Sequence, residues 1–122
     1  TMLHDFGRVL NPMLLQGQLQ GGVTQGIGQA AFERVVHDAE SGQVLTGSYM
    51  DYQLPRADEI PSLVLETLET AAPNNPLGVK GCGEAGAAGG APAVMNALAD
   101  ALGGQKIDMP ATAERVWRAL RK

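Results

Sequence analysis

Residues 14–36, LLQGQLQGGVTQGIGQAAFERVV, carry the periodic pattern that decides the fold. The apolar residues recur at four-residue steps, which forms one face of a helix. They are Leu15, Leu19, Val23, Ile27, Ala31 and Val35. Asn11-Pro12, just upstream, is a turn or helix-start signal. The pattern therefore predicts a helix over about residues 14–36.

Five glycines lie inside this predicted helix: Gly17, Gly21, Gly22, Gly26 and Gly28. Each costs about 1 kcal/mol relative to alanine in a helix interior. Gly17 and Gly21 are four residues apart, as are Gly22 and Gly26, so the two pairs line two adjacent stripes of the helix. A glycine stripe lets another backbone or a ligand approach the helix axis closely, and we expect such a neighbour here.

Strands are predicted on both sides of the glycine-rich helix. Residues 2–10 read as the end of a strand that turns at Asp5-Phe6-Gly7. A Ser41-Gly42 turn followed by the alternating run 43–50 predicts a β-hairpin, and residues 63–70 alternate as a further strand.

Two helices are predicted towards the C-terminus. The first begins at Ala91, with Pro92 in its first turn and Gly103-Gly104 as its end. The second follows Pro110, with Thr112 as its N-cap, and we expect Trp117 to pack it against the body.

Composition limits the size of the core. Of the 122 residues, 44% are hydrophobic but only 4% are aromatic and 16 are glycine, so the core must rely on small side chains. These features predict one α+β domain over residues 1–122, with a Gly-rich helix, a β-hairpin or short mixed sheet, and two C-terminal helices. Such a core, together with the abrupt start of the sequence, indicates part of a larger molecule.

Charge and cysteine usage exclude several classes of function. The net charge is -4, and basic residues cluster only at the C-terminus, so nucleic-acid binding by a basic face is not expected. One cysteine, Cys82, with the distant His4 and His37 forms neither an internal disulfide nor a four-ligand zinc site. No apolar run approaches the ~18 residues of a membrane span, so a soluble chain is expected.

Residues 78–90, GVKGCGEAGAAGG, combine a single carboxylate with a dense set of glycines. Gly81, Gly83 and Gly86 formally match the dinucleotide fingerprint G-x-G-x-x-G. The match lacks the required context, because no strand directly precedes it and no βαβ unit surrounds it. We interpret residues 71–90 as a functional loop, whose backbone N–H groups and following helix favour an anion.

Glu84 is the candidate catalytic residue of this loop. Its neighbours are small, so the carboxylate is free to face a cavity, where partial removal from water makes a carboxylate a stronger general base. An exposed loop acid, or an acid at a helix N-terminus, explains the same residues, and local sequence does not decide between these readings. Lys80 is placed to pair with a cofactor phosphate, to act on Glu84 or to remain solvated. Cys82 lacks an activating His or Asp nearby and suits packing.

Four segments in order resemble the C-terminal end of the xanthine dehydrogenase and aldehyde oxidase family. They are DFGRVLNPMLLQGQLQGGVTQGIGQAAFE, TGSYMDYQLPRADEIP, NPLGVKGCGEAGAAGGAPAVMNALADAL and IDMPATAERVWRAL. The resemblance covers nearly the whole chain and is greatest for the branch with the carbon monoxide dehydrogenase large subunits. It implies a C-terminal segment of a molybdenum hydroxylase molybdopterin-binding domain.

The resemblance also implies residue roles. Glu84 corresponds to the active-site glutamate of the family's G-x-G-E loop, which accepts a proton in metal-assisted base catalysis while the cofactor carries the redox chemistry. The residues implied to contact the cofactor are Gly21, Gly22, Thr24, Gln25, Gly26 and Gly28 in the helix, and Lys80, Gly81, Cys82 and Gly83 in the loop. No side chain of this chain is implied as a metal ligand.

The implied enzyme hydroxylates a small substrate or oxidises carbon monoxide in the cytoplasm. Its cofactor is molybdopterin, expected in the cytosine dinucleotide form. Its partners are the remainder of the molybdopterin-binding subunit and the iron–sulfur and flavin subunits. The chain alone is expected to bind no cofactor and to be inactive. The alternative is a stand-alone, non-enzymatic α+β interaction domain derived from this family.

Overall fold

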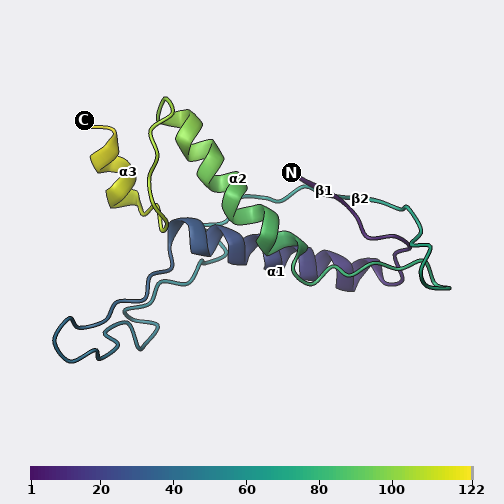
Figure 1. Ribbon diagram of the computed structural model, residues 1–122, viewed down its shortest axis with the longest axis horizontal. Coiled ribbons are helices and arrows are strands. Elements are labelled where there is room, and N and C mark those ends of the chain that lie inside the picture. The colour runs from purple at the N-terminus through teal and green to yellow at the C-terminus, as the bar shows by residue number, and fades with distance from the viewer. Residues whose placement is uncertain (122) are drawn as a thin grey trace.

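The computed structural model describes residues 1–121 as three helices and two strands. In chain order these are β1 (Met2–Asp5), α1 (Pro12–Ala31), β2 (Leu65–Leu68), α2 (Ala85–Ala101) and α3 (Ala113–Ala119). Figure 1 shows α2 lying across the long helix α1, with the two strands on one side and α3 at the far end. The predicted α+β class is confirmed.

Helix α1 begins at Pro12, two residues before the predicted Leu14 and directly at the Asn11-Pro12 start signal. Asn11 is its N-cap, and the Asn11 side-chain oxygen accepts a hydrogen bond from the Leu14 amide at 3.1 Å. Pro12 fits the first turn because an amide there would have no helical partner.

The end of α1 differs from the prediction. The helix stops at Ala31, five residues before the expected Val36. The Gly28 carbonyl accepts from both Phe32 and Glu33 at 2.9 and 2.8 Å, which closes the last turn. The apolar pattern continues past the end because side-chain spacing alone does not show where backbone bonding changes.

Helices α1 and α2 cross at two facing pairs of glycines. A Cβ built on Gly26 would lie 2.8 Å from the Ala91 nitrogen, and one built on Gly86 would lie 2.5 Å from the Val23 nitrogen. Gly22 likewise faces the backbone around Gly86. The predicted close approach is therefore confirmed for one stripe, and its partner is the backbone of α2.

Helix α2 begins at Ala85, six residues earlier than the predicted Ala91. The glycines of its first turns are costly in an isolated helix, but packing on α1 offsets that cost, since tertiary contacts supply most helical stability. Pro92 consequently lies inside the helix and not in its first turn. The predicted end is confirmed, because Gly103 and Gly104 adopt positive φ angles of 65° and 91°.

The sheet consists of β1 and β2 paired in parallel, from Met2 opposite Leu65 to Asp5 opposite Leu68. Both strands fall within predicted ranges. The strand predicted over residues 43–50 is wrong, because that region has only an isolated antiparallel bridge between His37 and Val44.

The turn predicted at Ser41-Gly42 is confirmed. Gly42 adopts a φ of 71°, and Asp38 accepts from the Ser41 amide at 2.8 Å. Beyond the bridge the chain bends again, because the Ser48 carbonyl accepts from the Tyr52 amide at 2.8 Å. A second turn so soon leaves no length for a strand ladder.

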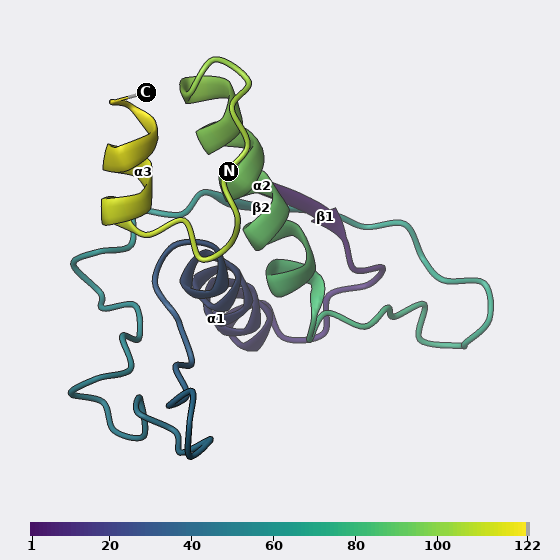
Figure 2. The same ribbon diagram turned by 60° about the vertical axis from the view of Figure 1, so that its left-hand side comes forward.

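Residues 33–61 form an irregular arm that projects away from the helix pair in both views (Figures 1 and 2). At its base the Tyr52 hydroxyl donates a hydrogen bond to the Glu33 carboxylate. That bond, together with burial, raises the pKa of Tyr52. Further out, Tyr49 and Met50 are 83% and 93% exposed, so the arm is held at its base and open at its tip.

Helix α3 is capped as predicted, since the Thr112 hydroxyl accepts from the Arg115 amide at 3.4 Å. The expectation for Trp117 is wrong. Its side chain is 52% exposed, and the Arg121 guanidinium lies 3.9 Å from the ring centre. The indole therefore stacks with a cation at the surface, a contact that apolar spacing does not reveal.

The core is small and built mainly from small residues. The buried hydrophobic residues among those described are Phe6, Leu19, Ala30, Ala91 and Ala111. Within residues 1–121 no helix has the length and apolar character needed to cross a membrane. The same residues contain no group of three His, Cys, Asp or Glu side chains placed to hold a metal ion.

Candidate active site

The loop between β2 and α2 returns to the turn that follows β1. The Phe6 carbonyl accepts from the Lys80 amide at 3.0 Å, and the Gly78 carbonyl accepts from the Arg8 amide at 2.9 Å. Gly7 has a φ of 61°, and a Cβ there would collide with the Gly78 carbonyl oxygen. Glycine at position 7 thus permits both the turn and the contact with the loop.

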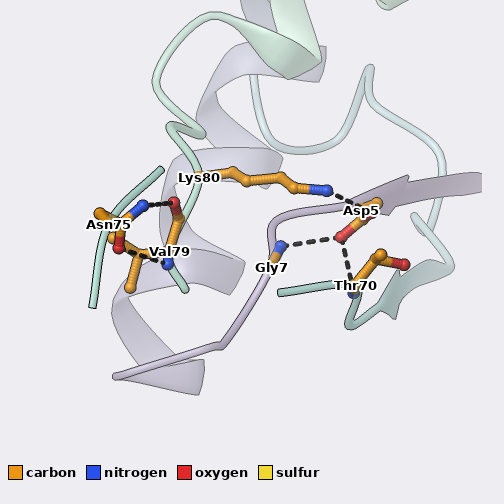
Figure 3. A network of polar contacts seen from close by, with 6 residues as sticks. All are labelled: Asp5, Gly7, Thr70, Asn75, Val79 and Lys80. Carbon is orange, nitrogen blue, oxygen red and sulfur yellow. Dashed lines mark hydrogen bonds and ion pairs between the residues drawn. The ribbon is translucent and has the colours of Figure 1, made fainter. Parts of the chain in front are cut away.

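Asp5 connects three segments at this junction (Figure 3). One carboxylate oxygen accepts from the Gly7 amide at 2.8 Å and the Thr70 amide at 3.1 Å. The other pairs with the Lys80 ammonium at 2.6 Å. The Lys80 contact, followed by the two amide hydrogen bonds, holds the pKa of Asp5 well below its usual range.

Asn75 fixes the same loop from its other side (Figure 3). Its side-chain amide donates to the Val79 carbonyl at 3.0 Å and accepts from the Val79 amide at 3.1 Å. The backbone just before Lys80 is therefore held by a side chain as well as by the turn.

Glu84 occupies the N-cap position of α2, with φ -104° and ψ -6°. Its side chain is exposed and makes no capping hydrogen bond, while its carbonyl accepts from the Ala88 amide at 2.9 Å. Two residues later, Gly86 is packed against the backbone of Gly22. The carboxylate thus starts from a fixed backbone point and faces the surface of the described chain.

Several residues predicted to contact the cofactor lie at open surface. Gly21 and Gln25 are exposed on α1, and Gly81 and Gly83 are exposed in the loop. Nothing lies within 4 Å of a Cβ built on any of these three glycines. A large planar group can approach such backbone closely, and the Gln25 amide is available as a donor.

Other predicted residues have protein neighbours instead. Gly22 and Gly26 face α2. A Cβ on Gly28 would collide with the Glu33 carboxylate and lie 2.8 Å from the Pro55 ring. The structure thus supplies a reason within this chain for three glycines that the resemblance assigns to the cofactor.

The remaining predicted residues line two separate hollows. Thr24 lines one of about 430 Å³ with Gln20 and residues of the stretch 55–63. Lys80 and Cys82 line another of about 230 Å³ beside the first turns of α1. The described residues therefore bring the predicted cofactor contacts to α1 and to the loop, but not into one shared cavity.

Asp5 is the residue that the sequence reasoning missed. A local signal was present, because an Asp two residues before a glycine is typical of a turn in which the carboxylate accepts from the backbone. Its partner Lys80 lies 75 residues further along the chain. No short-range pattern identifies that pairing.

The profile of the molybdopterin cofactor-binding domain matches residues 1–61, half of the chain. The chain belongs to this molybdopterin-binding family. The resemblance read from the sequence is confirmed, since relatives include a carbon monoxide dehydrogenase large chain and a xanthine dehydrogenase molybdenum-binding subunit.

Two relatives illustrate the extent of the similarity. The nicotine 6-hydroxylase large subunit of Paenarthrobacter nicotinovorans is 41% identical over 120 residues, 96% of this chain and 15% of that protein. The carbon monoxide dehydrogenase large chain of Afipia carboxidovorans is 40% identical over 119 residues, 95% of this chain and 15% of that protein. The chain therefore spans about 15% of the length of these curated relatives.

Solved structures share the fold. Quinoline 2-oxidoreductase from Pseudomonas putida 86 superposes with a TM-score of 0.89 at 38% identity, over 97% of this chain and 15% of that one. The Cu,Mo-CO dehydrogenase gives a TM-score of 0.86 at 39% identity, over 94% and 15% of the two chains. The domain thus matches part of larger molybdenum enzyme structures.

Proposed function

We propose that this chain is the C-terminal portion of the large subunit of a molybdopterin-dependent oxidoreductase, with Glu84 as the general base. The complete enzyme hydroxylates a small substrate or oxidises carbon monoxide. The observation that carries the proposal is the similarity to molybdenum-enzyme large subunits over nearly the whole chain. The anchored backbone on both sides of Glu84 supports it.

The proposed task of Glu84 is proton transfer. Its carboxylate accepts a proton from an oxygen nucleophile brought to about 2.6–3.2 Å, the reach of a hydrogen bond. The absence of a capping hydrogen bond leaves the side chain available for that contact. The backbone anchors limit the positions that the carboxylate can occupy, which is the condition for efficient proton transfer.

The molybdopterin cofactor, when bound, supplies the redox chemistry. We assign its contacts to open surface, namely Gly21, Gln25, Gly81 and Gly83, with Thr24 and Cys82 beside them. Gly22, Gly26 and Gly28 support this surface by bringing α2 and the arm against α1. Contact between Lys80 and a cofactor phosphate stays a prediction, since the partner of Lys80 in the structure is Asp5. The cytosine dinucleotide form is likewise proposed.

The proposed partners are the remainder of the molybdopterin-binding subunit and separate iron–sulfur and flavin subunits, in the cytoplasm. Support comes from a protein of P. nicotinovorans that is 41% identical to this chain. Its name, subunit gamma of the 6-hydroxypseudooxynicotine dehydrogenase complex, describes one subunit of a larger assembly. Because the chain spans about 15% of its relatives, we propose that it is inactive alone.

Replacement of Glu84 in the full-length enzyme tests the assignment. Glu84→Gln should lower kcat by about 10³-fold or more while leaving molybdopterin content unchanged, because the amide keeps the shape but accepts no proton. Glu114→Gln is the matched control, since Glu114 is an acid in the first turn of α3. Wild-type turnover in Glu84→Gln would refute the assignment.

A further inference from the structure

We infer that Asp5 and Lys80 are positioning residues, which clamp the start of the Glu84 loop onto the turn after β1. The inference rests on the proposed function of Glu84 and goes beyond it by naming what holds the base in place. Neither residue is proposed to touch the reacting groups. Each acts through the backbone of the loop.

The clamp joins parts of the chain that are far apart in sequence. Asp5 ends β1, Thr70 follows β2, and Lys80 lies ten residues later in the loop. The Asp5 and Lys80 side chains are 28% and 35% exposed, so the ion pair is partly shielded from water. Its strength comes from one carboxylate that accepts three hydrogen bonds at once.

The residues between the clamp and Glu84 have little support of their own. Nothing lies within 4 Å of a Cβ on Gly81 or Gly83, and glycine has the most backbone freedom of any residue. Glu84 is therefore positioned by the anchors on either side of it. These are the clamp at Lys80 and the packing of Gly86 on α1.

The clamp also determines the charge near the base. Lys80 is the one cationic residue in the stretch 78–90, and its ammonium is paired with Asp5. Loss of the Asp5 charge frees the Lys80 ammonium, which lies four residues from Glu84 in the sequence. The free ammonium can then pair with the Glu84 carboxylate. Loss of Lys80 instead removes both the cation and the ion pair with Asp5, while Asn75 still holds the backbone at Val79.

The test uses the full-length, cofactor-loaded enzyme with Asp5→Asn, Lys80→Met and the double variant. Hydrogen exchange of the hydrogen-bonded amides 78–80 should accelerate about tenfold in each single variant, as expected for losing a hydrogen bond to a charged group. The double variant should exchange no faster than the faster single variant, because both substitutions remove the same ion pair.

Kinetics supply a second readout. Misplacement of the base should lower kcat by up to ~100-fold, with KM within about twofold of wild type. Lys80→Arg keeps the cation, so its amide exchange and its kcat should both lie close to the wild-type values. Exchange in α2 beyond residue 91 should stay at the wild-type rate, which separates local loosening from unfolding.

Asp38→Asn is the matched control, since Asp38 also accepts three hydrogen bonds, from Ser41 and Glu40 in the arm. It should leave both exchange of amides 78–80 and kcat unchanged. Unchanged exchange in Asp5→Asn and Lys80→Met would overturn the clamp, and faster exchange with wild-type kcat would overturn its positioning role. Full turnover in Glu84→Gln would instead overturn the role of Glu84 as base, so the two failures are distinguishable.

Discussion

The two glycine stripes of α1 have the same composition and spacing but different surroundings. Gly22 and Gly26 are buried against α2, where even a methyl group would meet backbone atoms. Gly17 and Gly21 are exposed, with nothing within 4 Å of the position that a Cβ would take. Packing on α2 accounts for the glycines of the first stripe. The glycines of the second stripe destabilise the helix, and no contact with a described residue offsets that cost. This favours a partner outside the described residues.

The largest effect in this comparison is expected at the packed stripe. Gly86→Ala should lower the free energy of unfolding by about 2 kcal/mol, because overpacking costs up to about 3 kcal/mol and helix propensity returns about 1 kcal/mol. Gly89→Ala, in the same helix but with open space at the Cβ position, should gain stability. Urea unfolding followed by circular dichroism compares the two. Equal effects would contradict the close crossing.

Alanine substitutions in the open stripe should instead raise the free energy of unfolding. Gly17→Ala and Gly21→Ala should each stabilise the chain by about 1 kcal/mol in the same unfolding experiment, since alanine is the better helix former and meets no neighbour. In the full-length enzyme, Gly21→Ala should lower molybdopterin content if the cofactor lies on this stripe. Stabilisation without loss of cofactor would remove Gly21 from the proposed cofactor contacts.

A smaller effect on stability is expected from the Asp5 charge, which anchors the loop that leads into α2. Because the folded state holds the pKa of Asp5 below its ordinary value of 3.8, the ionised carboxylate stabilises the fold above that pH. This contribution is lost progressively as the pH falls below 3.8 towards the lower folded value. Urea midpoints of wild type and Asp5→Asn should therefore differ at neutral pH and converge in acid. A constant difference at every pH would contradict the role of the ionised carboxylate.

Features set by short-range chemistry were predictable from the sequence. The helix-start signal at Asn11-Pro12, the Thr112 cap and the Gly103-Gly104 end each depend on residues within one helical turn, and all three are confirmed. The glycine spacing also predicted a close approach to α1. It did not show which stripe meets α2, because both stripes have the same sequence pattern.

Features that depend on distant partners were not predictable. The first turns of α2 need α1 to offset their glycines, so the sequence alone suggested a loop there. The Asp5–Lys80 pair joins the end of β1 to the loop after β2, and no periodicity connects positions 75 residues apart. Trp117 had helical spacing but no partner surface, and it stacks with Arg121 instead.

The most direct test of a positioned base is Glu84→Asp in the full-length enzyme. Aspartate keeps the carboxylate but is one methylene shorter, while the anchors at Lys80 and Gly86 keep the backbone in place. If the base is positioned in this way, kcat should fall about 100-fold, the cost of a misplacement of about 1 Å, with KM and molybdopterin content unchanged. Wild-type kcat in Glu84→Asp would contradict it, because a carboxylate that works from either position is not being positioned.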